Sequence, residues 1–280
     1  MAIGYKQVTL ITGASSGIGF AIAFELLKRN HLVLASMRRP DKAQPLFEAH
    51  PDYPLFKDNL RLIKLDVTAD SADKTIARLI KEYGVLDIVI NNAGLGVYGP
   101  FEDLTDEDFR LQFETNFFGA LRIARAVLPG MRKQGRGKLI NVSSILGHLA
   151  IPTGSAYTAS KWAMEAWSEA LRYEVAPFGL TVTLIEPGLI RTQFKKNMVV
   201  AKAADPAYSF LHKLIDRNYE RMATSPEACA RRIAKIILRA APATRYRVGL
   251  DAHLYYFLRQ LLPDRLVEAL IKIYVGKPGL

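Results

Sequence analysis

A glycine-rich segment near the N-terminus constrains the fold of this chain more than any other feature. Residues 12–19 have the sequence Thr-Gly-Ala-Ser-Ser-Gly-Ile-Gly, and they join an apolar run at 8–12 to an apolar helical pattern at 17–30. Small residues at such a turn let the backbone approach a pyrophosphate, whose charge is favoured by the exposed N–H groups of a helix N-terminus. Three glycines could also serve simple turn geometry, but the strand before them and the helix after them favour a dinucleotide site.

Apolar runs of strand length alternate with amphipathic helical patterns up to Pro187. Several runs are rich in Val, Ile and Leu without strict alternation, which is typical of parallel strands covered on both faces. Strands that alternate with helices predict βαβ units, and therefore an α/β fold with a Rossmann-like, doubly wound parallel sheet in a single domain. The predicted strands are 8–12, 32–36, 61–65, 87–91, 138–143 and 181–186, and the predicted helices are 17–30, 71–83, 106–130 and 156–177.

The pattern changes after Pro187. Residues 189–225 show no strand pattern, and we expect a lid there. A C-terminal helical extension should complete the same domain. We therefore expect residues 1–193 to form the cofactor-binding and catalytic core, and residues 194–280 to form the lid, a helix at 226–240, a last strand at 246–249 and two helical pieces at 253–275 broken at Pro263.

The charge of the chain is unevenly distributed. The 38 Lys and Arg against 27 Asp and Glu give +11, of which residues 1–193 contribute 22 − 20 = +2 and residues 194–280 contribute 16 − 7 = +9. A solvated helical surface is the simplest interpretation, and peripheral contact with a membrane or an acidic ligand is the alternative. Without a binding motif or regular aromatic–basic interleaving, a nucleic-acid partner is not expected.

Other compositional features narrow the class of protein. Cys229 is the single cysteine, which excludes an intrachain disulfide and a thiolate zinc cage and fits a cytoplasmic protein. No cationic segment precedes an apolar one at the N-terminus, so we expect no signal peptide. The longest charge-free stretch, 139–160, is too polar for a transmembrane helix.

The end of the second predicted strand bears on the choice of cofactor. A carboxylate there would bind the ribose hydroxyls of NAD, but the sequence has Ser36-Met37-Arg38-Arg39. Guanidinium groups can hold a 2′-phosphate through charge-assisted hydrogen bonds, so the sequence favours NADP(H) over NAD(H). An ordinary exposed arginine pair is the alternative.

Tyr157 and Lys161 stand four residues apart on a predicted helix and so share one face. A neighbouring ammonium should lower the pKa of a tyrosine, which could then exchange a proton with a substrate oxygen near neutral pH. The same spacing also occurs at Tyr53 and Lys57, so spacing alone is weak evidence for a catalytic pair. Context separates the two pairs, because Ser144 at the end of the fifth strand could bind the same oxygen and Asn116 could fix a water leading to Lys161.

These motifs together resemble the short-chain dehydrogenase/reductase family. Three segments occur in that family's order and spacing, together with Asn116, Ser144, Tyr157 and Lys161. They are Thr-Gly-Ala-Ser-Ser-Gly-Ile-Gly (12–19), Asn-Asn-Ala-Gly (91–94) and Pro187-Gly188. The resemblance covers about residues 5–193. Asn-Ala-Gly-Leu-Gly (92–96), Arg38 and a late Ala-Thr-Arg-Tyr-Arg segment are similar to the branch of 17β-hydroxysteroid and retinol dehydrogenases.

The resemblance implies a role for each matching residue. Tyr157 would be the general acid/base, Lys161 would hold the nicotinamide ribose, Ser144 would orient the substrate and Asn116 would complete a proton relay. The implied cofactor-binding residues are Gly13, Ser15, Ser16, Gly17 and Ile18 at the phosphates, Arg38 at the 2′-phosphate, Asp66 and Val67 at the adenine, Asn92 at the adenosine ribose, and Pro187, Gly188, Ile190 and Thr192, with Tyr157 and Lys161, at the nicotinamide end.

The predicted substrate walls are mostly apolar. They include Val97 and Phe194, which predicts a lipophilic ketone, aldehyde or alcohol of steroid, retinoid or long-chain type, unless these residues only pack the lid. His148 lies between Ser144 and Tyr157 and could face the substrate, although a local hydrogen bond would explain it as well. The histidines share no metal-ligand spacing, so we predict no metal site.

Two functions follow from this sequence. The first is an NADP(H)-dependent oxidoreductase that interconverts a carbonyl and an alcohol, with a homodimer or homotetramer as the expected assembly. The second is a catalytically silent NADPH-binding sensor or scaffold on the same fold. The apolar C-terminal segment 254–273 could pack on the core, cover the cleft or lie on a membrane surface.

Overall fold

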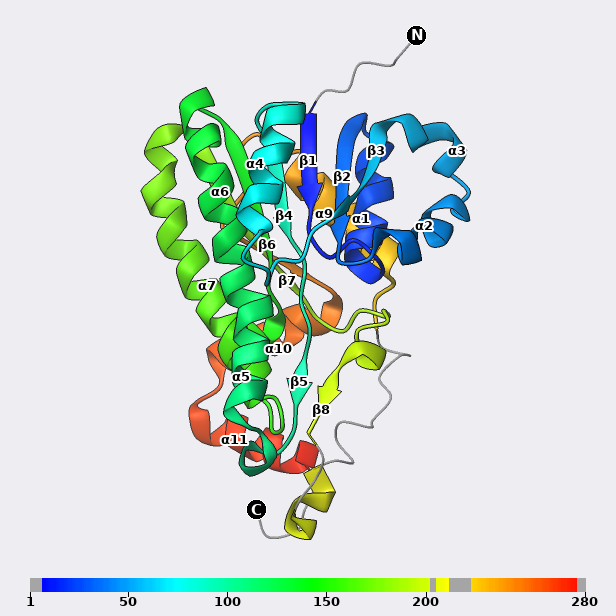
Figure 1. Ribbon diagram of the computed structural model, residues 1–280. Coiled ribbons are helices and arrows are strands. Elements are labelled where there is room, and N and C mark those ends of the chain that lie inside the picture. The colour runs from blue at the N-terminus through cyan, green and yellow to red at the C-terminus, as the bar shows by residue number, and fades with distance from the viewer. Residues whose placement is uncertain (1–6, 202–204, 212–222, 276–280) are drawn as a thin grey trace.

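A seven-stranded parallel sheet forms the centre of the protein (Figure 1). The computed structural model describes residues 7–201, 205–211 and 223–275. The strand order is β3-β2-β1-β4-β6-β7-β9, so the order reverses between β1 and β4, where ligands bind in doubly wound sheets. The strands are β1 (Gln7–Ile11), β2 (His31–Met37), β3 (Leu60–Lys64), β4 (Ile88–Asn91), β6 (Gly137–Val142), β7 (Leu180–Pro187) and β9 (Arg245–Val248).

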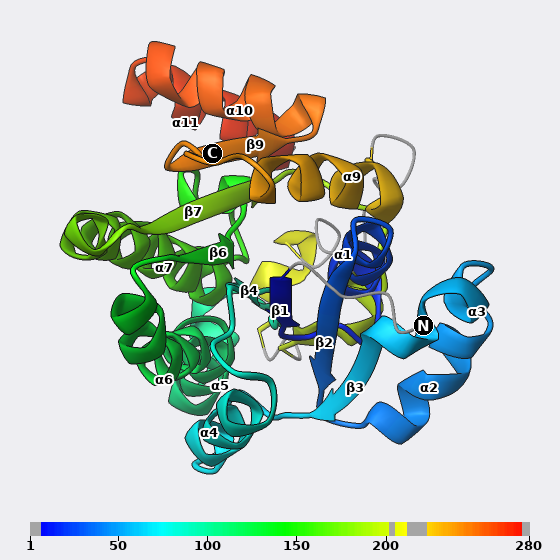
Figure 2. The ribbon, with the colours of Figure 1, turned by 90° about the horizontal axis from the view of Figure 1, so that it is seen from above.

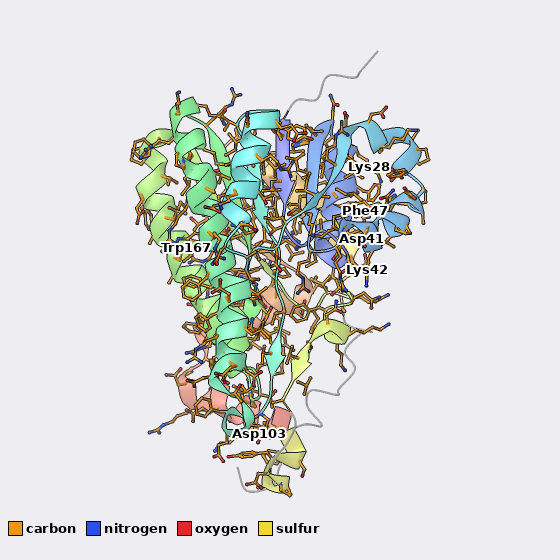
Figure 3. All side chains as sticks on the ribbon, viewed as in Figure 1. Lys28, Asp41, Lys42, Phe47, Asp103 and Trp167 are labelled. Atoms are coloured by element: carbon orange, nitrogen blue, oxygen red, sulfur yellow. The ribbon has the colours of Figure 1, made fainter. Side chains whose placement is uncertain are left out.

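Helices cover both faces of the sheet (Figure 2). One face carries α1 (Gly17–Leu27), α2 (Pro40–Glu48) and α9 (Pro226–Ile237), and the other carries α4 (Ala72–Tyr83), α6 (Gly119–Gln134) and α7 (Ser155–Val175). Phe47 packs in the first core and Trp167 against the second, on opposite sides of the molecule (Figure 3). Burial on both faces explains why the strand sequences are continuously apolar.

The predicted fold class is confirmed. Each of the six strands predicted before Pro187 lies within one residue of an observed strand at either end. The short helices α2 and α3 (Tyr53–Phe56) were not predicted. Both contain proline and bury few side chains, so they carry a weak periodic signal.

Two further predictions were wrong in detail. The predicted helix at 106–130 is divided into α5 (Asp106–Phe113), a π-helical turn (Glu114–Phe118) and α6. The 189–225 region, for which no strand was predicted, contains β8 (Val199–Val200), which pairs in parallel with β5 (Val97–Tyr98). Two-residue strands are too short for periodicity to reveal, and their pairing depends on residues about a hundred positions apart in the chain.

The C-terminal segment adds to the main sheet. Strand β9 pairs with β7, and α10 (Leu250–Leu261) and α11 (Asp264–Val275) lie beyond β9 at that edge of the molecule (Figure 2). The break between these two helices falls at Pro263, as predicted. None of the helices in the described ranges is long and apolar enough to cross a bilayer.

Candidate active site

The glycine-rich loop is shaped by contacts that leave no room for side chains. Gly13 has φ +66°, and a Cβ added to it would lie 2.6 Å from Ala93 Cα. A Cβ on Gly19 would lie 2.5 Å from Asn92 Nδ2. The Asn92 amide donates 3.0 Å hydrogen bonds to the carbonyls of Thr12 and Gly13. The loop is therefore pressed onto the end of β4, and its backbone is held in one shape.

The start of α1 suits a phosphate group. Its N-cap residue Ser16 makes no side-chain capping hydrogen bond, so the first backbone N–H groups are not capped by that side chain. Ser15 is exposed, and Ser16, Gly17 and Ile18 are partly exposed. These residues fit the pyrophosphate role that was predicted for them, which stays a prediction.

The predicted adenosine end lies along the same edge of the sheet. Arg38 follows β2 and is exposed. Asp66 follows β3, and its Oδ1 accepts hydrogen bonds from Thr68 N at 3.0 Å and Thr68 Oγ1 at 2.8 Å. Val67 is buried at 7% exposure. The arrangement places a cation at the end of β2 and a carboxylate at the end of β3, where the sequence predicted them.

The segment after β7 closes against the glycine-rich loop. Pro187 ends β7, and Gly188 N donates to Val248 O at 2.9 Å. A Cβ on Gly17 would lie 3.1 Å from Thr192 Cγ2, so these two predicted residues are neighbours. Ile190 bridges to Thr224. The structure thus brings the predicted phosphate and nicotinamide residues together.

Ser144, Tyr157 and Lys161 meet at the carboxyl ends of β6 and β7. Tyr157 is buried and packs against two aromatic rings, with centroid distances of 5.5 Å to Tyr98 and 5.8 Å to Phe194. Burial raises the pKa of Tyr157 to about 12, while its hydrogen bond with Ser144 lowers it. Tyr157 is therefore protonated at neutral pH in this structure.

Lys161 lies beside Tyr157, and its predicted lowering of the tyrosine pKa stays a prediction. Its Nζ lies 5.7 Å from the Tyr157 ring centroid and donates to Val142 O at 2.9 Å. Burial lowers the pKa of Lys161 to about 8, and the Glu165 carboxylate raises it. Desolvation by burial is the largest cause of the pKa shift of both groups.

Asn116 lies in the π-helical turn between α5 and α6. Its Oδ1 accepts from Leu95 N at 2.9 Å, and its Nδ2 donates to Leu95 O at 3.0 Å. The side chain thereby fixes the segment before β5. The predicted water relay from Asn116 to Lys161 stays a prediction, and single π-helical turns often mark functional sites.

The two remaining predicted substrate residues lie in different surroundings. Val97 is fully buried in β5, next to the Tyr98 ring that stacks on Tyr157. The Nε2 atom of His148 lies 3.2 Å from Glu186 Oε1 and 3.7 Å from Glu165 Oε2. The imidazole Nε2 thus faces two carboxylates of the protein, and the contact of His148 with substrate stays a prediction.

Three site residues escaped the sequence analysis as individual positions. Thr12 Oγ1 accepts from the backbone N–H groups of Asn92 and Ala93 at 3.0 Å each, which ties the loop to β4. The Asp251 carboxylate accepts from Leu189 N at 2.5 Å, and Glu186 is fully buried directly before Pro187. Thr12 begins the glycine-rich motif, so its position was a usable signal; the other two had none.

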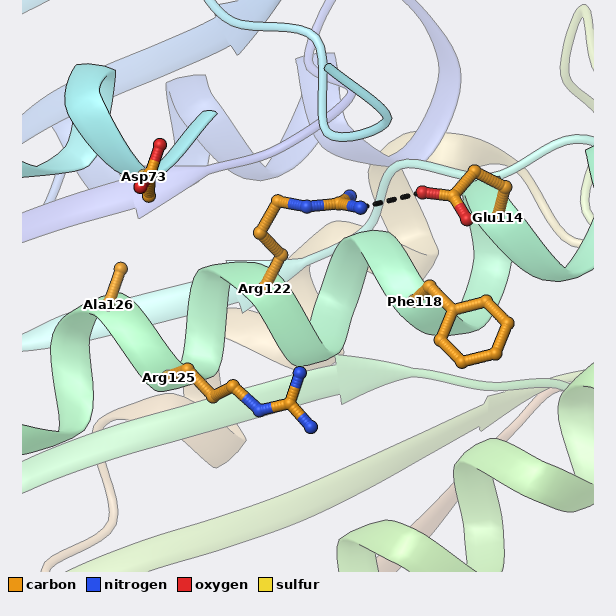
Figure 4. Close-up of a pocket in the computed structure, with 6 residues that line it drawn as sticks. All are labelled: Asp73, Glu114, Phe118, Arg122, Arg125 and Ala126. Carbon is orange, nitrogen blue, oxygen red and sulfur yellow. Dashed lines mark hydrogen bonds and ion pairs between the residues drawn. The ribbon is translucent and has the colours of Figure 1, made fainter. Parts of the chain in front are cut away.

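A surface cavity of about 520 Å³ lies away from these residues (Figure 4). It is bordered by α4, α6 and the π-helical turn, and the Arg122 guanidinium is ion-paired with Glu114 at 2.7 Å within it. None of its lining residues is a predicted catalytic or cofactor residue.

A doubly wound sheet, a glycine-rich loop at the switch point and a buried serine–tyrosine–lysine group together define a nucleotide-dependent oxidoreductase of the Rossmann type. Comparison with known proteins agrees with that class. A family profile described as short chain dehydrogenase matches residues 7–203.

Relatives match along nearly the whole chain. The 3-ketodihydrosphingosine reductase of Bacteroides thetaiotaomicron is 38% identical over 275 residues, which cover 96% of this chain and 97% of the relative. Retinol dehydrogenase 8 of Bos taurus is 32% identical over 257 residues, covering 87% and 81% of the two chains.

Solved structures match in the same way. A short-chain dehydrogenase from Streptomyces avermitilis has a TM-score of 0.82 and 34% identity, and the match covers 97% of both chains. The closed form of a serine dehydrogenase complexed with NADP⁺ has a TM-score of 0.71 and 28% identity, covering 86% and 94%. The chain belongs to the short-chain dehydrogenase/reductase family. It is an oxidoreductase that acts on CH–OH and C=O groups with a nicotinamide cofactor.

Proposed function

We propose that this protein is an NADPH-dependent reductase of lipophilic ketones or aldehydes, with Tyr157 as the general acid. The single observation that carries this proposal is the environment of Tyr157, which packs against Tyr98 and Phe194 and is hydrogen-bonded to Ser144. A tyrosine that is protonated at neutral pH can donate to the oxygen of a carbonyl as it is reduced.

In the proposed reaction, Ser144, Tyr157 and Lys161 have different roles. Ser144 orients the carbonyl oxygen, and the Tyr157 hydroxyl gives that oxygen its proton. A reduced nicotinamide cofactor, when bound, supplies the hydride to the carbonyl carbon. Lys161, buried one turn from Tyr157, provides the positive charge that stabilises the tyrosinate left behind.

The lipophilic substrate is supported by the lid. The strand pair β5–β8 connects Tyr98 to the lid that carries Phe194, and both rings face Tyr157. The names of two relatives, a 3-ketodihydrosphingosine reductase and a retinol dehydrogenase, also denote lipophilic substrates. We propose that residues 194–280 serve as lid and extension to a core formed by residues 1–193.

The proposed activity is tested by following NADPH oxidation with carbonyls of increasing chain length. Long-chain, steroid or retinoid carbonyls should be turned over with a higher kcat/KM than short water-soluble ones, because only the former bury apolar surface against the lid. A clear preference for short polar carbonyls would contradict the proposed substrate class.

Cofactor preference should depend on Arg38. In a fluorescence titration at one fixed salt concentration, we expect NADPH to bind about tenfold more tightly than NADH, a difference of about 1.4 kcal/mol. Arg38→Ala should remove most of this difference because the 2′-phosphate loses its partner. Arg78→Ala, on the exposed face of α4, is the matched control. Equal binding of both cofactors by the unaltered protein would favour NAD(H).

We also propose a cytoplasmic homo-oligomer that can contact a membrane surface. Leu111, Phe118 and Trp162 are exposed on α5, the π-helical turn and α7, which supports subunit pairing there. On α10 and α11, exposed apolar side chains recur at i, i+4 and i+7, which supports the proposed membrane contact. Sedimentation should show a particle of two or four chains, and sedimentation with phospholipid vesicles should deplete it from solution. A monomer that ignores vesicles would contradict both proposals.

A further inference from the structure

A buried ionic network joins the C-terminal segment to the active site. Glu186, fully buried, lies 3.2 Å from Arg247 through its Oε2, and 3.5 Å from Arg245 through its Oε1. The same Oε1 is 3.2 Å from His148 Nε2. One carboxylate at the end of β7 thus contacts two arginines of β9 and the histidine of the loop after β6.

A second carboxylate extends the network to the catalytic helix. Glu165 Oε2 accepts from Arg245 Nε at 3.0 Å, and His148 Nε2 lies 3.7 Å away. Glu165 follows Lys161 by four residues on α7 and so lies one turn away on the same face. The contacts of Arg245 therefore reach the helix that presents Tyr157 and Lys161.

Glu165 of the network also packs against the loop that carries Ser144. An added Cβ on Gly147 would lie 2.8 Å from Glu165 Cγ and 3.1 Å from Ser143 Oγ, so this loop packs directly on α7 at Gly147. The Tyr256 ring of α10 contacts two members of the network. It lies 3.3 Å from the Arg247 guanidinium carbon and edge-on to His148, with 5.3 Å between ring centroids.

A bound cation is a less suitable explanation for this cluster. The ligand atoms of His148, Glu165 and Glu186 lie within 4.8 Å of one another, a spacing that a metal ion could use. However, the guanidinium groups of Arg245 and Arg247 already balance the two carboxylates. A divalent ion would leave an excess positive charge in a buried site, which is costly.

We propose that Arg247, acting through Glu186 and His148, is a positioning residue that aligns Ser144 with Tyr157 from the C-terminal segment. This inference rests on the proposed function, because it assigns Ser144 and Tyr157 their catalytic roles. Arg247 touches neither of them, and it acts by holding the loop after β6 against α7. A displacement of about 1 Å in such an arrangement can cost about 10²-fold in rate.

Arg247→Met tests this role, since it keeps an unbranched side chain as far as about the position of Nε and removes the charged guanidinium. We expect kcat to fall about 10- to 100-fold with the Kd for NADPH unchanged within about twofold, and Arg247→Lys to restore part of kcat. Arg239→Met is the matched control, because the Arg239 guanidinium also packs on a tyrosine, Tyr246, and donates its hydrogen bond to the hydroxyl of that same residue. Equal losses in the two methionine variants would overturn the proposal.

Amide hydrogen exchange gives a second readout that needs no substrate. In the unaltered protein, the amides of Leu146, Gly147 and His148 are hydrogen-bonded within the loop. Arg247→Met should speed exchange in 144–148 about tenfold or more and leave β4 unchanged. Unchanged exchange in 144–148, or unchanged kcat, would overturn the inference. The proposed function is tested separately by Tyr157→Phe. If that variant retains turnover, the proposed function fails, whatever the Arg247 variants do.

Discussion

Tyr157→Phe should lower kcat by about 10²- to 10⁴-fold and leave NADPH binding largely unchanged. The loss is the usual contribution of a positioned acid, since phenylalanine has no proton to give to the substrate oxygen. The retained ring can still pack against Tyr98 and Phe194, so the fold should be unaffected. The measurement is NADPH oxidation with the best lipophilic carbonyl, combined with a fluorescence titration of NADPH.

Tyr173→Phe is the control for this experiment. Tyr173 lies on the same helix, is 68% exposed, and donates a hydrogen bond to Glu169 at 3.3 Å. Its loss should change neither kcat nor NADPH binding. If Tyr157→Phe turned over substrate as fast as the unaltered protein, Tyr157 would not be the acid. NADPH binding without turnover of any carbonyl would favour a sensor or scaffold.

Gly13→Ala should weaken NADPH binding by at least about tenfold and lower Tm. Two costs combine at this position. A residue with a Cβ is strained at φ +66°, by about 1–2 kcal/mol, and its Cβ would lie 2.6 Å from the Ala93 backbone. The loop must therefore move away from β4, which displaces the N–H groups that approach the phosphates. Differential scanning fluorimetry and the NADPH titration measure the two effects.

Gly135→Ala separates these two costs. Gly135 ends α6 at φ +69°, and nothing lies within 4 Å of an added Cβ. Gly135→Ala should introduce only the backbone strain. It should therefore lower Tm by about 2–8 °C and leave the Kd for NADPH unchanged. Equal Tm losses and unchanged NADPH affinity in both variants would show that the contact with Ala93 does not shape the cofactor site.

Local sequence patterns predicted most of the sheet and placed the residues that we propose as catalytic. Strands covered on both faces need continuous apolar runs, and these are visible without knowing which strands are neighbours. Helical spacing placed Tyr157 and Lys161 on one face of α7, and the glycine-rich segment predicted a turn that only small residues can form. The π-helical turn was invisible, because its sequence continues the helical pattern of α5 and α6.

Tertiary structure decided everything that depends on distant residues. β5 pairs with β8, and Tyr98 of β5 and Phe194, just before β8, both pack against Tyr157. Burial of this tyrosine, and with it the rise in its pKa, depends on such contacts. The other tyrosine with a lysine four residues later, Tyr53, lies in α3 at the opposite side of the molecule (Figure 1).

The ionic network shows the same division between sequence and structure. Glu186, His148 and Arg247 are separated by up to 99 positions, and each is an unremarkable polar residue in its own segment. Their contact exists because β9 pairs with β7 and the loop after β6 ends beside them. The sequence alone determined which residues form strands, turns and the Tyr157–Lys161 pair, since these depend on neighbours in the chain. Burial, charge pairing and the pKa of Tyr157 depend on contacts in space, and only the folded structure determined them.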